Sequence, residues 1–295
     1  MKSHPVFRNK ILPLILITPQ LLITIIFFIW PSLQALYLAF VRTDPFGLSI
    51  KFVGLANFVN LFSDKYYIQS ITTTILFSLI VTLISIPISL LLAVMVEKPI
   101  YFKKIFRTLL IWPYSLASSV AAVLWILLFQ PSIGLITKIL IYFGIQWNYI
   151  LNGTQAIILI TLVATWKQIS YNFIFFLSGL QSIPKSMIEA AEIDGANSKQ
   201  IFWKLIFPLL SPTTFFLLIM NLTYAFFDTF GIIDALTKGG PGKATETLTY
   251  KVYVDGIVNF NLSSSATQSV VLLILVSILT ALQFRYLDKR VIYQG

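Results

Sequence analysis

The chain alternates between long apolar runs and short polar segments, and this alternation predicts its architecture. Six apolar runs are long enough to cross a bilayer, since a transmembrane helix needs about 20 such residues. The runs occupy residues 11–40, 71–96, 108–129, 156–180, 205–235 and 266–284. The pattern therefore predicts an all-α, polytopic membrane protein with six transmembrane helices and one domain over residues 1–295.

Prolines interrupt the first run more than any other. Pro13, Pro19 and Pro31 lie within it. Proline removes a main-chain donor and crowds the preceding turn of a helix. We therefore expect this span to be kinked or split into pieces.

The polar stretch at 182–204, which leads into the fifth run, is patterned in its own right. Pro184 suits the first turn of a helix, and Ser182 or Ser186 is placed to cap it. Gly195 is expected to end that helix, because glycine adopts left-handed angles at no steric cost. The apolar face of this first helix is expected from Met187, Ile188, Ala191 and Ile193. Asn197 or Ser198 is expected to cap a second helix. The apolar face of the second helix is expected from Ile201, Phe202, Leu205 and Ile206.

Composition agrees with a membrane protein that has little mass outside the bilayer. Hydrophobic residues make up 57% of the 295 residues and charged residues only 11%, whereas about 25% is usual for soluble domains. The chain has no cysteine and a net charge of +10. The basic residues are scattered in loops beside apolar runs, so topology explains them better than binding to nucleic acid.

The distribution of basic residues predicts the orientation. Most of the 21 lysines and arginines lie in the N-terminus, in the turn after the second run, in the 182–204 stretch and in the C-terminal tail. Positively charged loops stay on the cytoplasmic side. Both termini and the 182–204 stretch are therefore expected in the cytoplasm.

One motif in this stretch resembles a known family. Glu189-Ala190-Ala191, then Gly195, then Leu205-Ile206-Phe207-Pro208 after nine residues, resembles the coupling loop of ATP-binding-cassette importer permeases. Leu205 and Phe207 depart mildly from the Ile and Leu that are commoner there. An ordinary amphipathic cytoplasmic loop is the alternative, because short motifs also match by accident.

The resemblance extends along the chain to permeases of the carbohydrate-uptake branch, and most closely to those of glycerol-3-phosphate importers. The matching segments begin at Pro5-Val-Phe-Arg, Phe52-Val-Gly-Leu, Trp166-Lys-Gln-Ile, Tyr224-Ala-Phe-Phe, Lys238-Gly-Gly-Pro and Thr245-Glu-Thr-Leu. The resemblance implies the type I importer permease fold in the bacterial plasma membrane. It also implies a second homologous permease, two ATPase subunits that use ATP and magnesium, and an extracytoplasmic solute-binding protein.

Lys167 is the clearest candidate for chemistry inside the membrane. Intramembrane charges are costly and default to functional hypotheses. With Trp166, Gln168 and Tyr171 it is placed to line a polar cavity, where a cation would compensate the charge of a phosphate. The alternatives are that Lys167 pairs with Asp228 or extends along the helix toward the interface.

The fifth run contributes a second candidate set. Asn221, Tyr224 and Asp228 follow i, i+3, i+7 spacing and are expected to share a helix face. The resemblance favours a face on the substrate pathway. Hydrogen bonding between helices is the alternative, since Asn and Tyr supply it in membrane bundles.

The coupling residues predicted from the resemblance are Glu189, Ala190, Ala191, Gly195 and Pro208. They suit a docking surface for a partner ATPase, so no catalytic residue is predicted in this chain. Gly239-Gly-Pro-Gly-Lys243 lacks the features of a phosphate-binding loop, and one His without Cys cannot build a zinc site. No cofactor or metal is therefore expected in this chain itself.

The predicted function is that of a permease subunit that forms, with a second permease, the pathway for sn-glycerol-3-phosphate or glycerophosphodiesters. A neutral sugar or oligosaccharide is the alternative substrate. A secondary transporter using Lys167 and Asp228 as a proton relay would leave the 182–204 stretch without a purpose. A membrane-embedded enzyme would need clustered acids or ligands, whereas the 11 acidic residues are dispersed.

Overall fold

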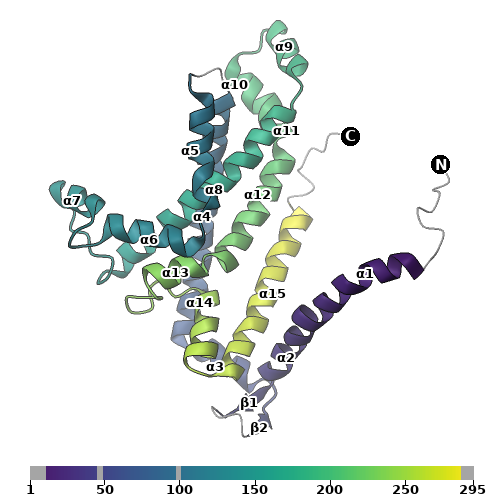
Figure 1. The fold of residues 1–295 in the computed structure, drawn as a ribbon, viewed down its shortest axis with the longest axis vertical. Coiled ribbons are helices and arrows are strands. Elements are labelled where there is room, and N and C mark those ends of the chain that lie inside the picture. The colour runs from purple at the N-terminus through teal and green to yellow at the C-terminus, as the bar shows by residue number, and fades with distance from the viewer. Residues whose placement is uncertain (1–10, 45–48, 98–100, 287–295) are drawn as a thin grey trace. The chain divides into compact units, whose positions relative to one another are not determined.

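The computed structural model describes residues 11–44, 49–97 and 101–286 of the chain (Figure 1). Helices dominate these residues, as the apolar runs predict. The chain divides into two compact units, Met1–Ser63 with Val252–Val271 and Asp64–Lys251 with Leu272–Gly295.

The predicted spans correspond to apolar helical elements, but two of them are bent. Four helices of the described residues are long and apolar enough to cross a membrane: Leu14–Ala39, Lys65–Glu97, Gly153–Ser182 and Leu262–Arg285. Two bent pairs reach the same length and hydropathy only when joined: Lys103–Ser115 with Ser118–Phe129, at 107°, and Ser198–Leu209 with Ser211–Asp228, at 63°. The third and fifth runs are therefore broken helices, which the hydropathy pattern does not reveal.

The first unit begins with the proline-containing run. Its helical elements are α1 (Ile11–Thr24), the π-helical turn η1 (Ile25–Ile29) and α2 (Trp30–Ala39). Pro19 lies inside α1 and Pro31 lies in the first turn of α2, yet residues 14–39 remain one helical stretch. The run is therefore not split, because local π-helical adjustment accommodates the backbone groups that proline frees.

A small polar assembly follows the first helical stretch. Strands β1 (Val41–Thr43) and β2 (Ile50–Phe52) pair antiparallel, with Arg42 opposite Lys51. The side chain of Asn57, in α3 (Ala56–Ser63), donates to the carbonyl oxygens of Ala39 and Val41 at 3.0 and 2.9 Å. These bonds satisfy main-chain groups where the first helical stretch ends.

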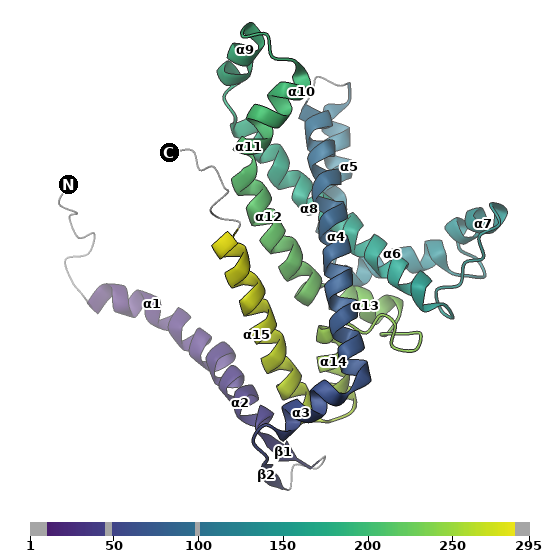
Figure 2. The same cartoon turned by 180° about the vertical axis from the view of Figure 1, so that it is seen from behind.

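The second unit is built around three helices that lie side by side: α4 (Lys65–Glu97), α8 (Gly153–Ser182) and α12 (Ser211–Thr223) (Figures 1 and 2). The other elements of this unit are α5 (Lys103–Ser115), α6 (Ser118–Phe129), α7 (Leu135–Tyr142), α9 (Lys185–Ile193), α10 (Ser198–Ile201), η2 (Phe202–Ile206), α11 (Phe207–Leu209), η3 (Tyr224–Asp228) and α13 (Phe230–Leu236). Helix α14 (Leu248–Tyr253), the π-helical turn η4 (Val254–Val258) and α15 (Leu262–Tyr286) follow in the chain.

The core of the second unit joins the three central helices toward the end that carries α9 and α10. Its buried residues are Leu90, Ala93, Val96, Phe173, Phe176, Leu177, Ile183, Leu210 and Leu217. Gly179 lets α8 approach the start of α12 closely, because a Cβ there would lie 2.8 Å from Leu210 Cδ2 and 3.1 Å from Thr213 Oγ1. Lipid provides no hydrophobic drive for helices to associate, so such close packing supplies much of the stability.

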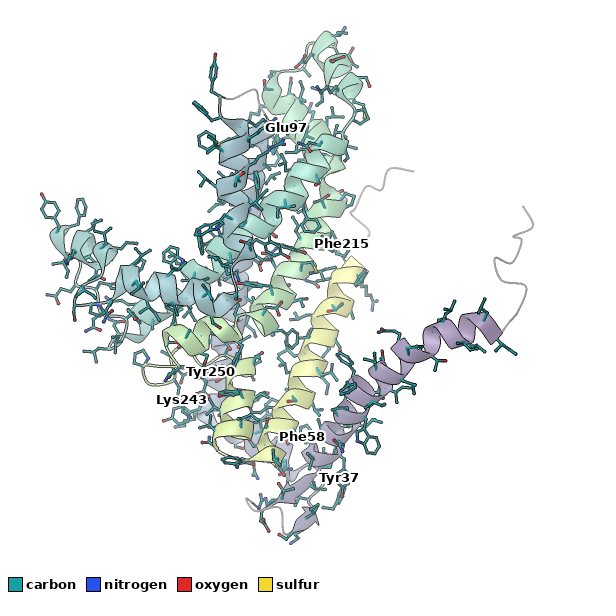
Figure 3. The ribbon with its side chains drawn as sticks, in the orientation of Figure 1. Tyr37, Phe58, Glu97, Phe215, Lys243 and Tyr250 are labelled. Atoms are coloured by element: carbon teal, nitrogen blue, oxygen red, sulfur yellow. The ribbon has the colours of Figure 1, made fainter. Side chains whose placement is uncertain are left out.

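Polar contacts tie the helix ends at this same end of the unit, where Figure 3 shows Glu97. The Glu97 carboxylate accepts hydrogen bonds from Arg107 at 3.3 Å and from Gln181 at 3.2 Å. It also forms an ion pair with Lys103 at 3.5 Å. Glu97 therefore links the end of α4, the start of α5 and the end of α8, directly before α9.

Candidate functional site

The break between α5 and α6 creates one wall of an intramembrane cavity. Helix α5 ends at Ser115 and α6 begins at Ser118, and the backbone of the linking residue Leu116 is extended. A sharp bend frees main-chain carbonyls at the end of the first helix. The Lys167 ammonium donates to the Leu116 carbonyl at 2.7 Å and to Ser118 Oγ at 3.1 Å.

The cavity lies between α5, α6, α8, α12 and η3 and has a volume of about 400 Å³. It is lined by Tyr114, Ser118, Lys167, Gln168, Tyr171, Met220, Thr223, Tyr224 and Asp228. It combines aromatic rings, hydroxyl groups, an amide, one cation and one carboxylate. This size and mixed lining suit a small polar solute.

Five of the seven cavity or pathway residues predicted from sequence meet in this cavity: Lys167, Gln168, Tyr171, Tyr224 and Asp228. Lys167 is only 7% exposed. Of the ion pairs within 4.0 Å formed by described residues, none joins Lys167 to Asp228. Lys167 instead bonds to Leu116 and Ser118 at the break between α5 and α6 and so stabilises the bend. The sequence pattern does not indicate this role.

Trp166 lies away from the cavity. Its ring meets that of Trp125 edge-on, with 5.5 Å between centroids. It lines a separate apolar groove between α4, α6 and α8. Successive residues of a helix point in different directions, and here Lys167 and Gln168 face the cavity whereas Trp166 faces the apolar groove.

Asn221 is fully buried between helices and does not line the cavity. Its side-chain amide donates to Asn172 Oδ1 at 2.8 Å and to the Leu217 carbonyl at 2.6 Å. The π-helical turn η3 begins at Tyr224 and changes the angular spacing of the residues that follow. The i, i+3, i+7 pattern therefore does not place Asn221 on the same surface as Asp228.

Sequence reasoning missed the cavity residues contributed by the third run. Tyr114 and Ser118 reach the cavity because the chain turns through 107° between them. Pro113, inside α5, is the one local signal for this break, but proline alone does not specify the direction of a bend.

The polar stretch forms two short helices joined at Gly195, as predicted. Gly195 has φ of +80°, and the main-chain N–H groups of Gly195 and Ala196 donate to the carbonyls of Glu192 and Ala191, both at 3.0 Å. This is the Schellman arrangement, in which a left-handed residue ends a helix. Asn197 caps the next helix reciprocally with Gln200, with both bonds at 2.9 Å.

Two finer predictions for this stretch are wrong. Neither Ser182 nor Ser186 caps α9, because Pro184 occupies the N-cap position and Ser182 Oγ donates instead to the Gly179 carbonyl. Met187 and Ile193 do not belong to a packed apolar face of α9, since they are 40% and 86% exposed. Ile188, in contrast, packs against the core.

The predicted coupling residues form a largely exposed surface. Glu189 and Ala190 are exposed and Ala191 is half-buried. Pro208 lies in α11, just after the π-helical turn η2 and just before the 63° bend. Because Pro208 lacks an N–H, it weakens helical bonding at this bend.

Comparison with known proteins identifies the family. The sequence profile described as "Binding-protein-dependent transport system inner membrane component" matches residues 61–293. The chain belongs to this family. Its members are transport permeases of the inner membrane, which agrees with the apolar spans found here.

Curated relatives of this permease cover nearly its whole length. It is 55% identical over 288 residues to the "sn-glycerol-3-phosphate transport system permease protein UgpA" of Agrobacterium fabrum, covering 98% of each chain. It is 53% identical over 292 residues to the protein of the same name from Escherichia coli strain UTI89, covering 99% of each chain.

Solved structures support the fold. A bacterial importer of the acidic polysaccharide alginate matches the permease with a TM-score of 0.80 at 22% identity, covering 93% of this chain and 96% of that chain. The complex of an alginate transporter with its alginate pentasaccharide-bound periplasmic protein matches with a TM-score of 0.81 at 21% identity, covering 93% of each chain. The permease therefore has the fold of importer permeases of the ATP-binding-cassette class.

Proposed function

We propose that this chain is one of two permease subunits of an ATP-driven importer for sn-glycerol-3-phosphate. The intramembrane cavity that contains Lys167 carries the proposal, together with 53–55% identity to glycerol-3-phosphate permeases over nearly the full length. Glycerophosphodiesters share the same glycerol and phosphate chemistry and are included in the proposed substrate class.

The cavity offers groups that match both halves of this substrate. An ammonium has three N–H donors, and two of those of Lys167 bond to the Leu116 carbonyl and to Ser118 Oγ. The remaining donor and the positive charge are suited to a phosphate that has left water. Gln168, Thr223 and the tyrosine hydroxyls are suited to the glycerol hydroxyls, with the second permease supplying the rest of the pathway.

The exposed surface of α9 and α10 is the proposed contact with a partner ATPase. Glu189 supplies a carboxylate for a basic group of the partner, and Ala190 and Ala191 allow a close approach. Gly195 fixes the turn between the two helices, and Pro208 lies at the bend that leads into the membrane. Closure of the ATPases would move this surface, and the spans would then expose the cavity to alternate sides.

The proposed complex contains this permease, a second homologous permease, two ATPase subunits and an extracytoplasmic solute-binding protein. ATP and magnesium are used by the ATPase subunits, so this chain carries no cofactor and catalyses no reaction. The distribution of lysine and arginine supports cytoplasmic termini and a cytoplasmic 182–204 segment.

Reconstitution of the complex in liposomes tests the proposal. We expect uptake of labelled sn-glycerol-3-phosphate to require ATP on the cytoplasmic side and the binding protein on the other. Unlabelled glycerophosphocholine should compete with the substrate, whereas glycerol and maltose should not. Uptake of maltose alone would favour the neutral-sugar alternative, and uptake driven by a proton gradient without ATP would overturn the ATP-driven mechanism.

A further inference from the structure

Three fully buried polar side chains meet between the central helices of the second unit. They are Ser85 of α4, Asn172 of α8 and Asn221 of α12, each 0% exposed. Ser85 Oγ donates to Asn221 Oδ1 at 2.8 Å, and Asn172 Nδ2 donates to Ser85 Oγ and Asn221 Oδ1, both at 3.2 Å. We call these three residues the amide clasp.

Every donor of the amide clasp is satisfied within the protein. The two N–H groups of Asn221 are used by Asn172 Oδ1 and the Leu217 carbonyl. The two N–H groups of Asn172 and the single hydroxyl of Ser85 are used within the clasp. A closed network of this kind offers nothing to a ligand, so it serves to join the three helices.

The clasp lies between the cavity and the core. Asn172 follows Tyr171, which lines the cavity, and precedes Phe173, which belongs to the core. Asn221 follows Met220 of the cavity, and its amide bonds to the carbonyl of Leu217 in the core. Helix α8 continues from Asn172 to Ser182, about 15 Å at the rise of an α-helix, and α9 begins three residues later.

We propose that Ser85, Asn172 and Asn221 are positioning residues that make α4, α8 and α12 move as one body. When the ATPase displaces α9, the three helices then move together, and the residues that line the cavity move with them. Without the clasp, the helices would slide past one another and the cavity would change less. This inference rests on the proposed function of the chain as an ATP-coupled permease.

Physical chemistry explains why such a connection is needed in a membrane. In a bilayer, apolar side chains interact with lipid about as favourably as with each other. Apolar contacts between two helices therefore resist sliding of one helix along the other only through the fit of their shapes. Hydrogen bonds between amides are directional and fix the register of neighbouring helices, as a single buried Asn does in coiled coils. The clasp therefore adds register to a core that otherwise consists of apolar contacts.

A matched pair of serine variants provides the first test. Ser85→Ala removes a bond between helices, whereas Ser89→Ala removes an equally buried hydroxyl that bonds only within α4, to the Ile86 carbonyl at 2.9 Å. The measurements are substrate uptake and ATP hydrolysis by the reconstituted complex. We expect Ser85→Ala to lower uptake per ATP by about 2- to 30-fold, the range of mutational effects on coupling, and Ser89→Ala to leave it unchanged.

Asparagine variants separate a coupling role from a purely structural one. Asn172→Leu leaves Asn221 with unpaired buried groups, so it should also lower the melting temperature of the complex. Replacing both partners by Asn172→Leu with Asn221→Leu removes the unpaired amide groups. The Ser85 hydroxyl, which loses both partners, can bond instead to a main-chain carbonyl of the preceding turn of α4, so the melting temperature should recover. We expect uptake per ATP to stay low in the double variant, because the fixed register is not restored.

The outcomes distinguish the clasp from the proposed function. A wild-type complex that fails to take up glycerol-3-phosphate with ATP would overturn the proposed function and this inference with it. If the wild type transports, equal uptake per ATP in Ser85→Ala and Ser89→Ala would overturn the clasp alone. Recovery of uptake per ATP together with melting temperature in the double leucine variant would also overturn it.

Discussion

The Lys167 ammonium lies 2.7 Å from the Leu116 carbonyl, across the break between α5 and α6. A membrane-buried cation thus satisfies a main-chain group that a 107° bend would otherwise leave unpaired. The same ammonium lines the cavity, so one side chain both shapes the wall and sets its charge. Neither an ion pair with Asp228 nor extension toward the interface is needed to explain its burial.

Substitutions at Lys167 separate these two tasks. Lys167→Met removes both the charge and the donor, and an unpaired buried carbonyl costs about 1–3 kcal/mol. Lys167→Gln keeps a donor for Leu116 but removes the charge. We expect both variants to lose glycerol-3-phosphate uptake at least about tenfold, equivalent to about 1.4 kcal/mol, and only Lys167→Met to lower the melting temperature of the complex.

Substrate competition completes this experiment. If Lys167 compensates the phosphate, Lys167→Gln should weaken competition by glycerophosphocholine as well as uptake of the labelled substrate. Full uptake by Lys167→Gln would show that the charge is not required and that Lys167 serves the helix break alone.

Glu189 and Glu192 provide a matched pair on α9. Both carboxylates are exposed and lie on the same short helix. Only Glu189 belongs to the proposed ATPase contact, where it would meet a basic group of the partner. We expect Glu189→Ala to abolish the stimulation of ATP hydrolysis by the substrate-loaded binding protein, and Glu192→Ala to retain it. Equal behaviour of the two variants would contradict the assignment of Glu189.

Gly195 allows a second test of the same loop. Its φ of +80° costs an ordinary residue about 1–2 kcal/mol, and more for a β-branched one, although open space surrounds the missing side chain. Gly195→Val should therefore change the angle between α9 and α10 and lower stimulated ATP hydrolysis, whereas Gly195→Asn should retain more of it.

Gly144 is the control for backbone strain. It has φ of +81° and equally open surroundings, but it lies just after α7, outside the coupling loop. We expect Gly144→Val to leave stimulated ATP hydrolysis unchanged. A loss of the same size at both positions would mean that general destabilisation, and not the loop geometry, explains the Gly195 result.

The elements that sequence predicted best are those determined by neighbouring residues. Gly195 and Asn197 end and begin helices through their own backbone freedom and side-chain chemistry, so the turn in the 182–204 stretch was predictable. The break at Leu116 is held by Lys167, 51 residues away. Asn221 belongs to the amide clasp because it bonds to Ser85 of α4 and to Asn172 of α8. Such features depend on tertiary partners, which the hydropathy of a single run does not contain.

A buried ion cluster in the second unit gives a prediction about stability. Lys251, 4% exposed, lies 3.6 Å from the carboxylates of both Asp64 and Glu246. The loop before it is further held by the main-chain N–H of Leu248, which donates to Thr74 Oγ1 at 2.8 Å. The cluster therefore fastens residues 246–251 to the start of α4.

Lys251→Met should destabilise this attachment strongly. Glu246 is only 5% exposed, and removing one partner of a buried pair typically costs about 3–5 kcal/mol because a charge is left uncompensated. Adding Glu246→Gln to Lys251→Met removes the uncompensated charge and should recover part of the loss. Lys243→Met is the control, because the Lys243 side chain is exposed and its ammonium lies over the face of the Tyr66 ring, 4.0 Å from the centroid, a contact that involves no buried carboxylate. The melting temperature of the purified complex is the measurement. If Lys251→Met melts no lower than Lys243→Met, the cluster contributes no more to stability than an exposed lysine does.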